Sequence, residues 1–210
     1  MRLGVGAVLE LCYTVELPNS IKVPQTFGKT RYWKHGLAVA ILSRELGSKV
    51  LTDKEELDSC YLAGLVHDIG LLVYDYLVPE QFDQFLATTD FNDPDQPLEA
   101  LKKNFFGISH SELGAAYLKE WWPVSPKIVE ATQAHGGPGL EKDQTPNLAR
   151  LVSTANRIAN KYGLDHPFET GLHQAADENY LETLKMSKQE MDELVDWAQI
   201  GVLAAESVLE

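Results

Sequence analysis

The sequence predicts an all-α protein. Apolar residues recur at helical spacing along most of its 210 residues, and no convincing strand alternation is found. Five predicted helix starts carry either a capping box or a cap residue directly before proline. The capping boxes are Thr52–Glu55, Ser109–Glu112 and Ser187–Glu190, and the cap–proline pairs are Ser125–Pro126 and Thr145–Pro146. We therefore expect a helical bundle without a sheet.

Apolar periodicity places the remaining helices. They are expected over residues 1–16, 27–46, 79–87, 98–105 and 151–162, with a further buried helical stretch at 60–73. Polar and glycine-rich segments at 92–97, 136–144 and 165–177 are expected to be loops. The double tryptophan Trp121–Trp122 at a helix end is expected to belong to the core.

Composition excludes several classes of protein. Acidic residues outnumber basic ones by 31 to 18, which gives a net charge of −13 and disfavours nucleic-acid binding. The two cysteines, Cys12 and Cys60, have no spacing that suggests a disulfide or a zinc finger. The sequence shows neither a signal peptide nor a membrane span, so we expect a cytoplasmic protein.

The adjacent pair His67–Asp68 lies in the apolar stretch between Cys60 and Val73. A carboxylate buried there needs a hydrogen-bonding partner, a counter-charge or a metal ion, or it takes up a proton. Two interpretations are equally good for the pair alone. It is either a metal site or a buried aspartate that is hydrogen-bonded to a neighbouring histidine or to a helix N-terminus.

Three further histidines, His35, His110 and His135, each share a helix face with apolar residues. A single histidine on such a face is more often a hydrogen-bonded core residue than a ligand. His110 follows a helix cap, where the helix dipole favours the neutral imidazole that binds metal. Together with His67 and Asp68, the three histidines favour a metal site. His166 and His173 are given no role.

The ordered set of motifs resembles the HD superfamily and, within it, the HDOD (HD-related output domain) proteins of bacterial signalling. The segments that carry the resemblance are Trp33–His35, Ala63–Gly70, Phe106–Gly114, Trp121–Pro123, Ile128–Pro138 and Leu151–Tyr162, which contains Ala155–Asn156. It implies an HD-like core at 27–165, a C-terminal helical segment of the same domain at 166–210, and an N-terminal remnant at 1–26 that lacks the family's usual first helices.

The resemblance also implies a ligand set for a divalent metal ion such as iron, manganese, magnesium, zinc or nickel. The implied ligands are His35, His67, Asp68, His110, His135 and Asn156, and the cations near the pocket that could hold phosphate are Arg31, Lys34 and Arg157. Three features depart from the catalytic relatives. Asn156 replaces an aspartate, Leu71 replaces a lysine, and a Gly-Tyr-Pro signature is absent.

Two functions follow from the resemblance. The first is a regulatory signalling module that retains most of a metal pocket and binds a signalling protein or a small phosphorylated ligand. The second is a metal-dependent phosphohydrolase acting on a nucleotide or another phosphoester, with Asp68 as both ligand and candidate base. The losses at Leu71 and Asn156 favour the first. A third alternative is a purely structural helical adaptor that holds no metal.

Overall fold

The computed structural model describes residues 29–91, 98–136, 146–164 and 186–209, and within these ranges every regular element is a helix. The fold is therefore all-α, as predicted. Its helices are α2 (Lys29–Val50), α3 (Lys54–Val66), α4 (Ile69–Leu77), α5 (Pro79–Thr88), α6 (Leu98–Phe106), α7 (His110–Trp121), α8 (Pro126–Ala134), α9 (Leu148–Lys161) and α11 (Lys188–Leu209).

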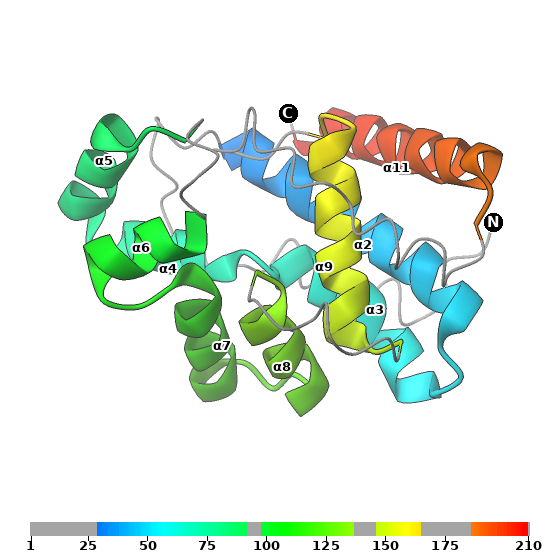
Figure 1. Cartoon of the computed structure of the whole chain (residues 1–210), viewed down its shortest axis with the longest axis horizontal. Coiled ribbons are helices and arrows are strands. Elements are labelled where there is room, and N and C mark those ends of the chain that lie inside the picture. The colour runs from blue at the N-terminus through cyan, green and yellow to red at the C-terminus, as the bar shows by residue number, and fades with distance from the viewer. Residues whose placement is uncertain (1–28, 92–97, 137–145, 165–185, 210) are drawn as a thin grey trace.

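The long helix α2 lies at the centre of one half of the molecule, where it packs against α3, α9 and α11 (Figure 1). In the other half, α7 packs against α4 and α8, while α5 contacts α4 and α6 contacts α7 at the end far from α11. Because α3 and α8 each also contact α9, the two halves share one hydrophobic core. A cluster of five side chains, here called the His/Asp cluster, lies where these helices meet. It consists of His35, His67, Asp68, His110 and His135.

Three of the five predicted helix starts are confirmed. Ser109 and Glu112 form a reciprocal capping box at the start of α7, and Ser187 and Glu190 do the same before α11. Ser125 caps α8 with proline in its first turn. The helices predicted at 27–46, 79–87, 98–105 and 151–162 also form, with ends that differ by a few residues.

The other two starts are wrong by one or two residues. Asp53, and not Thr52, caps α3, because its carboxylate accepts a hydrogen bond from the Glu56 backbone N–H at 3.0 Å. The helix predicted from Thr145–Pro146 begins later, at Leu148, where the Asn147 side chain accepts from the Arg150 backbone N–H at 2.9 Å. In both places an aspartate or asparagine side chain, and not the predicted threonine, forms the N-cap.

The apolar stretch 60–73 is two helices and not one. Helix α3 ends at Val66, α4 begins at Ile69, and His67–Asp68 form the turn between them. Among the described residues, only the span Lys54–Leu77 is apolar and long enough to be considered for crossing a membrane, and 83% of its most apolar window is buried inside the protein. This stretch is a core element.

Side-chain exposure corrects one further expectation. Trp121 is 75% exposed, so it is not a core residue, whereas Trp122 packs partly buried against the core.

Cys60 is a buried free cysteine, and burial raises its pKa to about 12. The helix expected at 1–16, Cys12, His166, His173 and most of the predicted loops lie outside the described residues.

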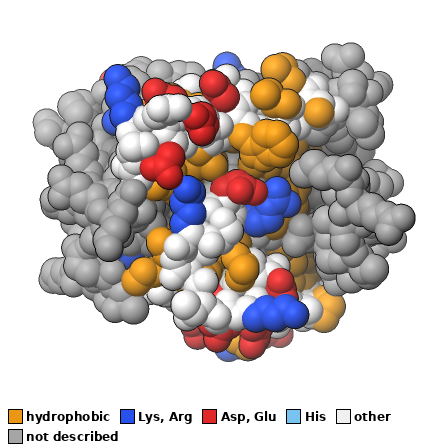
Figure 2. All heavy atoms as spheres, turned by 90° about the vertical axis from the view of Figure 1, so that its right-hand side faces the viewer, with side chains coloured by type: hydrophobic (Ala, Val, Ile, Leu, Met, Phe, Trp, Pro, Cys, Tyr) orange, Lys and Arg blue, Asp and Glu red, His pale blue; other side chains and the backbone are white. Residues whose placement is uncertain are grey.

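The face at the α11 end carries basic and acidic side chains close together, and the described part of it shows no large basic patch (Figure 2). This distribution agrees with the strongly acidic composition.

Candidate metal centre

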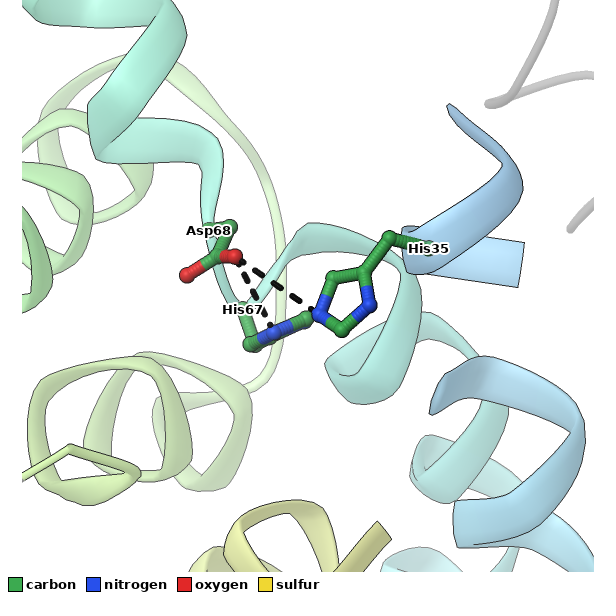
Figure 3. A group of neighbouring side chains, drawn as sticks. All are labelled: His35, His67 and Asp68. Carbon is green, nitrogen blue, oxygen red and sulfur yellow. Dashed lines mark ion pairs between the residues drawn. The ribbon is translucent and has the colours of Figure 1, made fainter. Parts of the chain in front are cut away.

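The structure brings together five side chains that the sequence singled out. His35 comes from α2, His67 and Asp68 from the α3–α4 turn, His110 from the first residue of α7 and His135 from the end of α8. Each of the five is at most 4% exposed. Figure 3 shows His35 and His67 with their rings directed toward the Asp68 carboxylate.

Two glycines allow α4 and α7 to approach closely enough for Asp68 and His110 to meet. A Cβ atom added to Gly70 would overlap the His110 backbone carbonyl, and one added to Gly114 would lie 2.9 Å from the Gly70 backbone nitrogen. The two glycines therefore allow backbone contact between α4 and α7. Asp68 and His110 lie beside this contact, and so the glycines set the distance between them.

Each of the four histidines has its Nδ1 atom next to an acceptor of the protein. The contacts are His35 to the Leu164 carbonyl at 3.1 Å, His67 to the Gly64 carbonyl at 2.7 Å, His135 to the Thr132 carbonyl at 2.7 Å, and His110 to the Glu99 carboxylate. When Nδ1–H donates to the carbonyl in His35, His67 and His135, each Nε2 atom carries a lone pair. His110 Nδ1 can donate to the Glu99 carboxylate but can only accept from the Lys102 ammonium, which lies 3.1 Å away. Its Nε2 atom carries a lone pair when Nδ1–H donates to Glu99. This arrangement is typical of histidines that bind metal through Nε2.

The four Nε2 atoms converge on the Asp68 carboxylate. His110 and His135 lie 2.9 and 3.3 Å from Asp68 Oδ1. On the other oxygen, Oδ2, the distances are 3.3 Å to His67 and 3.9 Å to His35. The cluster therefore consists of two groups that share Asp68. One contains His35 and His67, and the other contains His110 and His135.

The same atoms fit a cation chemically. The Nε2 atoms of His110 and His135 face each other at 3.1 Å, so two lone pairs would repel there unless a proton or a metal ion lies between them. The Nε2 atom of His67 is buried and has no hydrogen-bond partner. Buried polar atoms without partners are rare in native proteins. A divalent ion would satisfy all three nitrogens, so the buried His/Asp group could hold a metal.

Asn156 lies at the edge of this cluster. Its side-chain oxygen is 3.1 Å from His35 Nε2 and accepts from Asn160 Nδ2 at 3.3 Å. The residue is therefore close to one of the two groups, as the resemblance implies. Its carboxamide oxygen carries no charge, whereas an aspartate in this position would add an anion.

The three predicted phosphate-binding cations lie beside the ligands in sequence. Arg31 is exposed on α2, one turn before His35, and Lys34 is half-buried next to that histidine. Arg157 is half-buried on α9, directly after Asn156. Their contact with a phosphate stays a prediction.

Two charged residues at the site, the partly buried Glu99 and the buried Lys102 of α6, were missed from the sequence. Glu99 contacts His110 Nδ1, and Lys102 Nζ lies 3.1 Å from the same nitrogen at 2% exposure. Burial opposes ionisation of Glu99, but His110 and Lys102 together hold its pKa well below the usual range. The i, i+3 spacing of the two residues was the only available signal, and it is common on helix surfaces.

The fold and the site together define a helical domain of the HD type, in which a His-Asp pair and further histidines meet in a buried cluster. The family model of the HDOD domain matches residues 1–138. The chain therefore belongs to the HDOD domain family.

Other proteins are similar to this chain at lower identity. A protein of unknown function from Treponema pallidum (strain Nichols) is 22% identical over 169 residues, which make up 80% of this chain and 32% of that protein. A Marinobacter aquaeolei VT8 protein, provisionally named for signal transduction, has a TM-score of 0.73 at 21% identity, covering 96% of this chain and 44% of its own. An HDOD domain protein of unknown function from Geobacter sulfurreducens has a TM-score of 0.71 at 17% identity, with coverage of 97% and 70%.

The chain thus spans about a third of the Treponema protein and less than half of the Marinobacter chain. At these identities the solved structures show the fold alone.

Proposed function

We propose that this HDOD domain is a bacterial signalling module that holds a divalent metal ion in its buried His/Asp cluster and acts by binding a signalling protein or a small phosphorylated ligand. The burial of the cluster carries the proposal. All five side chains are at most 4% exposed. A catalytic metal site keeps a coordination position open to its substrate, whereas a structural site is closed by the protein.

The substitutions at two positions support the same function. Leu71 is fully buried in the core, so the position where catalytic relatives carry a lysine contributes packing here. Asn156 provides no anion beside His35. A phosphoryl-transfer site depends on cations that hold the phosphate and on metal ions that its ligands hold firmly. Both features are weakened here, while the ligands that bind the metal itself are retained.

The residues that would hold the metal are His35, His67, Asp68, His110 and His135, with Asn156 at the edge. When bound, the ion would supply positive charge that satisfies the lone pairs of the histidines and the Asp68 carboxylate at the meeting point of α2, α4, α7 and α8. In this role the site stabilises one arrangement of the helices, which is the arrangement that a partner would recognise.

A metal-dependent phosphohydrolase is the second candidate, and one observation favours it. The two histidine groups share Asp68, which is the arrangement that could place two metal ions on either side of one carboxylate. A two-metal centre can stabilise both oxygens of a phosphoryl displacement. Arg31, Lys34 and Arg157 would then hold the substrate phosphate, and Asp68 would act as ligand and base.

Elemental analysis of the purified protein, with His67→Ala as the matched variant, tests the proposal. We expect near-stoichiometric metal in the wild type, loss of metal in His67→Ala, and no turnover of nucleotide or generic phosphoesters by the metal-loaded protein. Turnover that Asp68→Ala abolishes in a folded protein would establish the phosphohydrolase instead. A wild type that holds no metal and binds none on addition of Mn²⁺ would leave only the structural adaptor.

A further inference from the structure

Glu99 and Lys102 contact His110 at the ring nitrogen that does not face Asp68. Glu99 Oε1 contacts Nδ1 of His110, and Lys102 Nζ lies 3.1 Å from that atom. The other ring nitrogen, Nε2, lies 2.9 Å from Asp68 Oδ1. A single imidazole ring therefore connects the Glu99 carboxylate to the centre of the cluster.

This contact distinguishes His110 from the other three histidines. Their Nδ1 atoms face backbone carbonyls of Leu164, Gly64 and Thr132. Only His110 has a carboxylate at that position among the four. A carboxylate acceptor fixes the ring orientation and makes Nε2 a stronger metal ligand than a neutral carbonyl does.

The Glu99 side chain is itself held in place by its surroundings. Its second oxygen, Oε2, accepts a hydrogen bond from the Ser111 hydroxyl at 3.1 Å. A Cβ atom at Gly136 would lie only 3.0 Å from Oε1, so the backbone that follows His135 packs directly against the carboxylate. Glu99 thus lies against both segments that carry the second histidine group.

We propose that Glu99 is a positioning residue that determines how tightly the Asp68–His110–His135 group holds a divalent cation. The inference rests on the proposed metal-binding function and adds a specific assignment to it. In the group that contains His35 and His67, the Nδ1 atoms face backbone carbonyls, and this group is expected to be independent of Glu99.

Calorimetric titration of the purified full chain with Mn²⁺ tests this assignment. Glu99→Gln keeps the size of the side chain and removes its charge, and we expect it to weaken Mn²⁺ binding by about 10–100-fold. The matched control is Glu130→Gln on the exposed face of α8, which should bind as the wild type does. An affinity of Glu99→Gln equal to that of the wild type would overturn the assignment.

Two further variants, in which Glu99→Gln is combined with the loss of one histidine, show which histidine group Glu99 acts on. In His35→Ala the Asp68–His110–His135 group remains, so Glu99→Gln should still cause its full loss of affinity. In His135→Ala that group is already disrupted, so Glu99→Gln should cause little further loss. An equal loss in both backgrounds would show a general disturbance of the fold and would overturn the assignment.

A second variant disturbs the Glu99 carboxylate without changing Glu99 itself. Gly136→Ala places a methyl group against Glu99, so we expect weaker Mn²⁺ binding while Glu99 itself is unchanged. Circular dichroism verifies that each variant is folded. Mn²⁺ binding that neither Glu99→Gln nor Gly136→Ala changes would overturn this inference alone. A wild type that binds no Mn²⁺ would overturn the proposed function and this inference together.

Discussion

Asn156 stands where the catalytic relatives carry an aspartate, and its neutral oxygen lies 3.1 Å from His35 Nε2. Asn156→Asp would add an anion at the edge of the cluster without a change in size. Two opposite unit charges 4 Å apart attract by about 4 kcal/mol at the effective dielectric constant typical of a protein surface. Mn²⁺ affinity, measured by calorimetry, should therefore rise by at least about tenfold. An unchanged affinity would place residue 156 outside the metal's coordination sphere.

Lys102 has the opposite expected effect. Its ammonium is buried beside His110 and repels a cation held on the other side of that ring. Lys102→Met keeps the length of the side chain and removes the charge, so we expect tighter Mn²⁺ binding than in the wild type. The control is Lys103→Met on the same helix, whose exposed ammonium pairs with Glu112. Weaker binding in Lys102→Met than in the control would contradict this expectation.

Sequence reasoning found five of the clustered residues and missed two, for a physical reason. His35, His67, Asp68, His110 and His135 were noticed because histidine or aspartate is unusual on an apolar face. Glu99 and Lys102 lie on a short amphipathic helix, where charged residues usually face solvent. The burial of Lys102 and the partial burial of Glu99 depend on the packing of α6 against α7, a tertiary contact that the local pattern does not contain.

At the scale of elements, the start of α7 determines the position of His110. Ser109 caps this helix, and its removal by Ser109→Ala should cost about 1 kcal/mol of unfolding free energy, measured by urea denaturation. Because His110 is the first residue of α7, we also expect weaker Mn²⁺ binding. Ser187→Ala removes an equivalent cap from α11 and is the control. It should lower stability by a similar amount and leave Mn²⁺ affinity unchanged.

Helix α4 carries a second buried carboxylate, Asp75. Burial and the nearby charge of Asp83 raise its pKa from the ordinary value of 3.8 to about 6. A raised carboxyl pKa favours folding while the group is protonated, and this contribution is lost as the pH rises from about 4 through 6. Asp75→Asn should therefore unfold at a higher temperature than the wild type at pH 8, with little difference at pH 4. Equal differences at both pH values would show that ionisation of Asp75 is not the cause.

The interruption between α3 and α4 shows what periodicity could not predict. Residues 60–73 are apolar on all sides, which is compatible with one continuous helix. The chain turns instead at His67–Asp68, and Gly70 allows α4 to approach α7 at that point. The two side chains then face a common centre, although adjacent helical residues diverge by about 100°. The helix boundary is therefore set by the packing of the site.

At the scale of the whole molecule, the cluster joins segments that are distant in the sequence. His35 and His135 are contributed by α2 and α8, which belong to the two halves of the fold (Figure 1). Asp68 lies within 3.9 Å of His35 and 3.3 Å of His135. With neither a proton nor a cation between them, the facing nitrogens of His110 and His135 oppose this arrangement. With one, the same contacts hold the two halves together. Metal binding is therefore expected to be coupled to the stability of the whole domain.

This coupling predicts the effect of metal on thermal unfolding. A ligand that binds only the folded state stabilises it by about 2.7 kcal/mol at 100 times its dissociation constant. For a chain of this size that corresponds to a rise in Tm of roughly 5–10 °C. We expect such a rise when Mn²⁺ is added to chelator-treated protein, measured by calorimetry, and no rise in His67→Ala. Because the cluster spans both halves, the unfolding should remain one cooperative transition. A Tm that Mn²⁺ does not change in the wild type would contradict metal-linked stability.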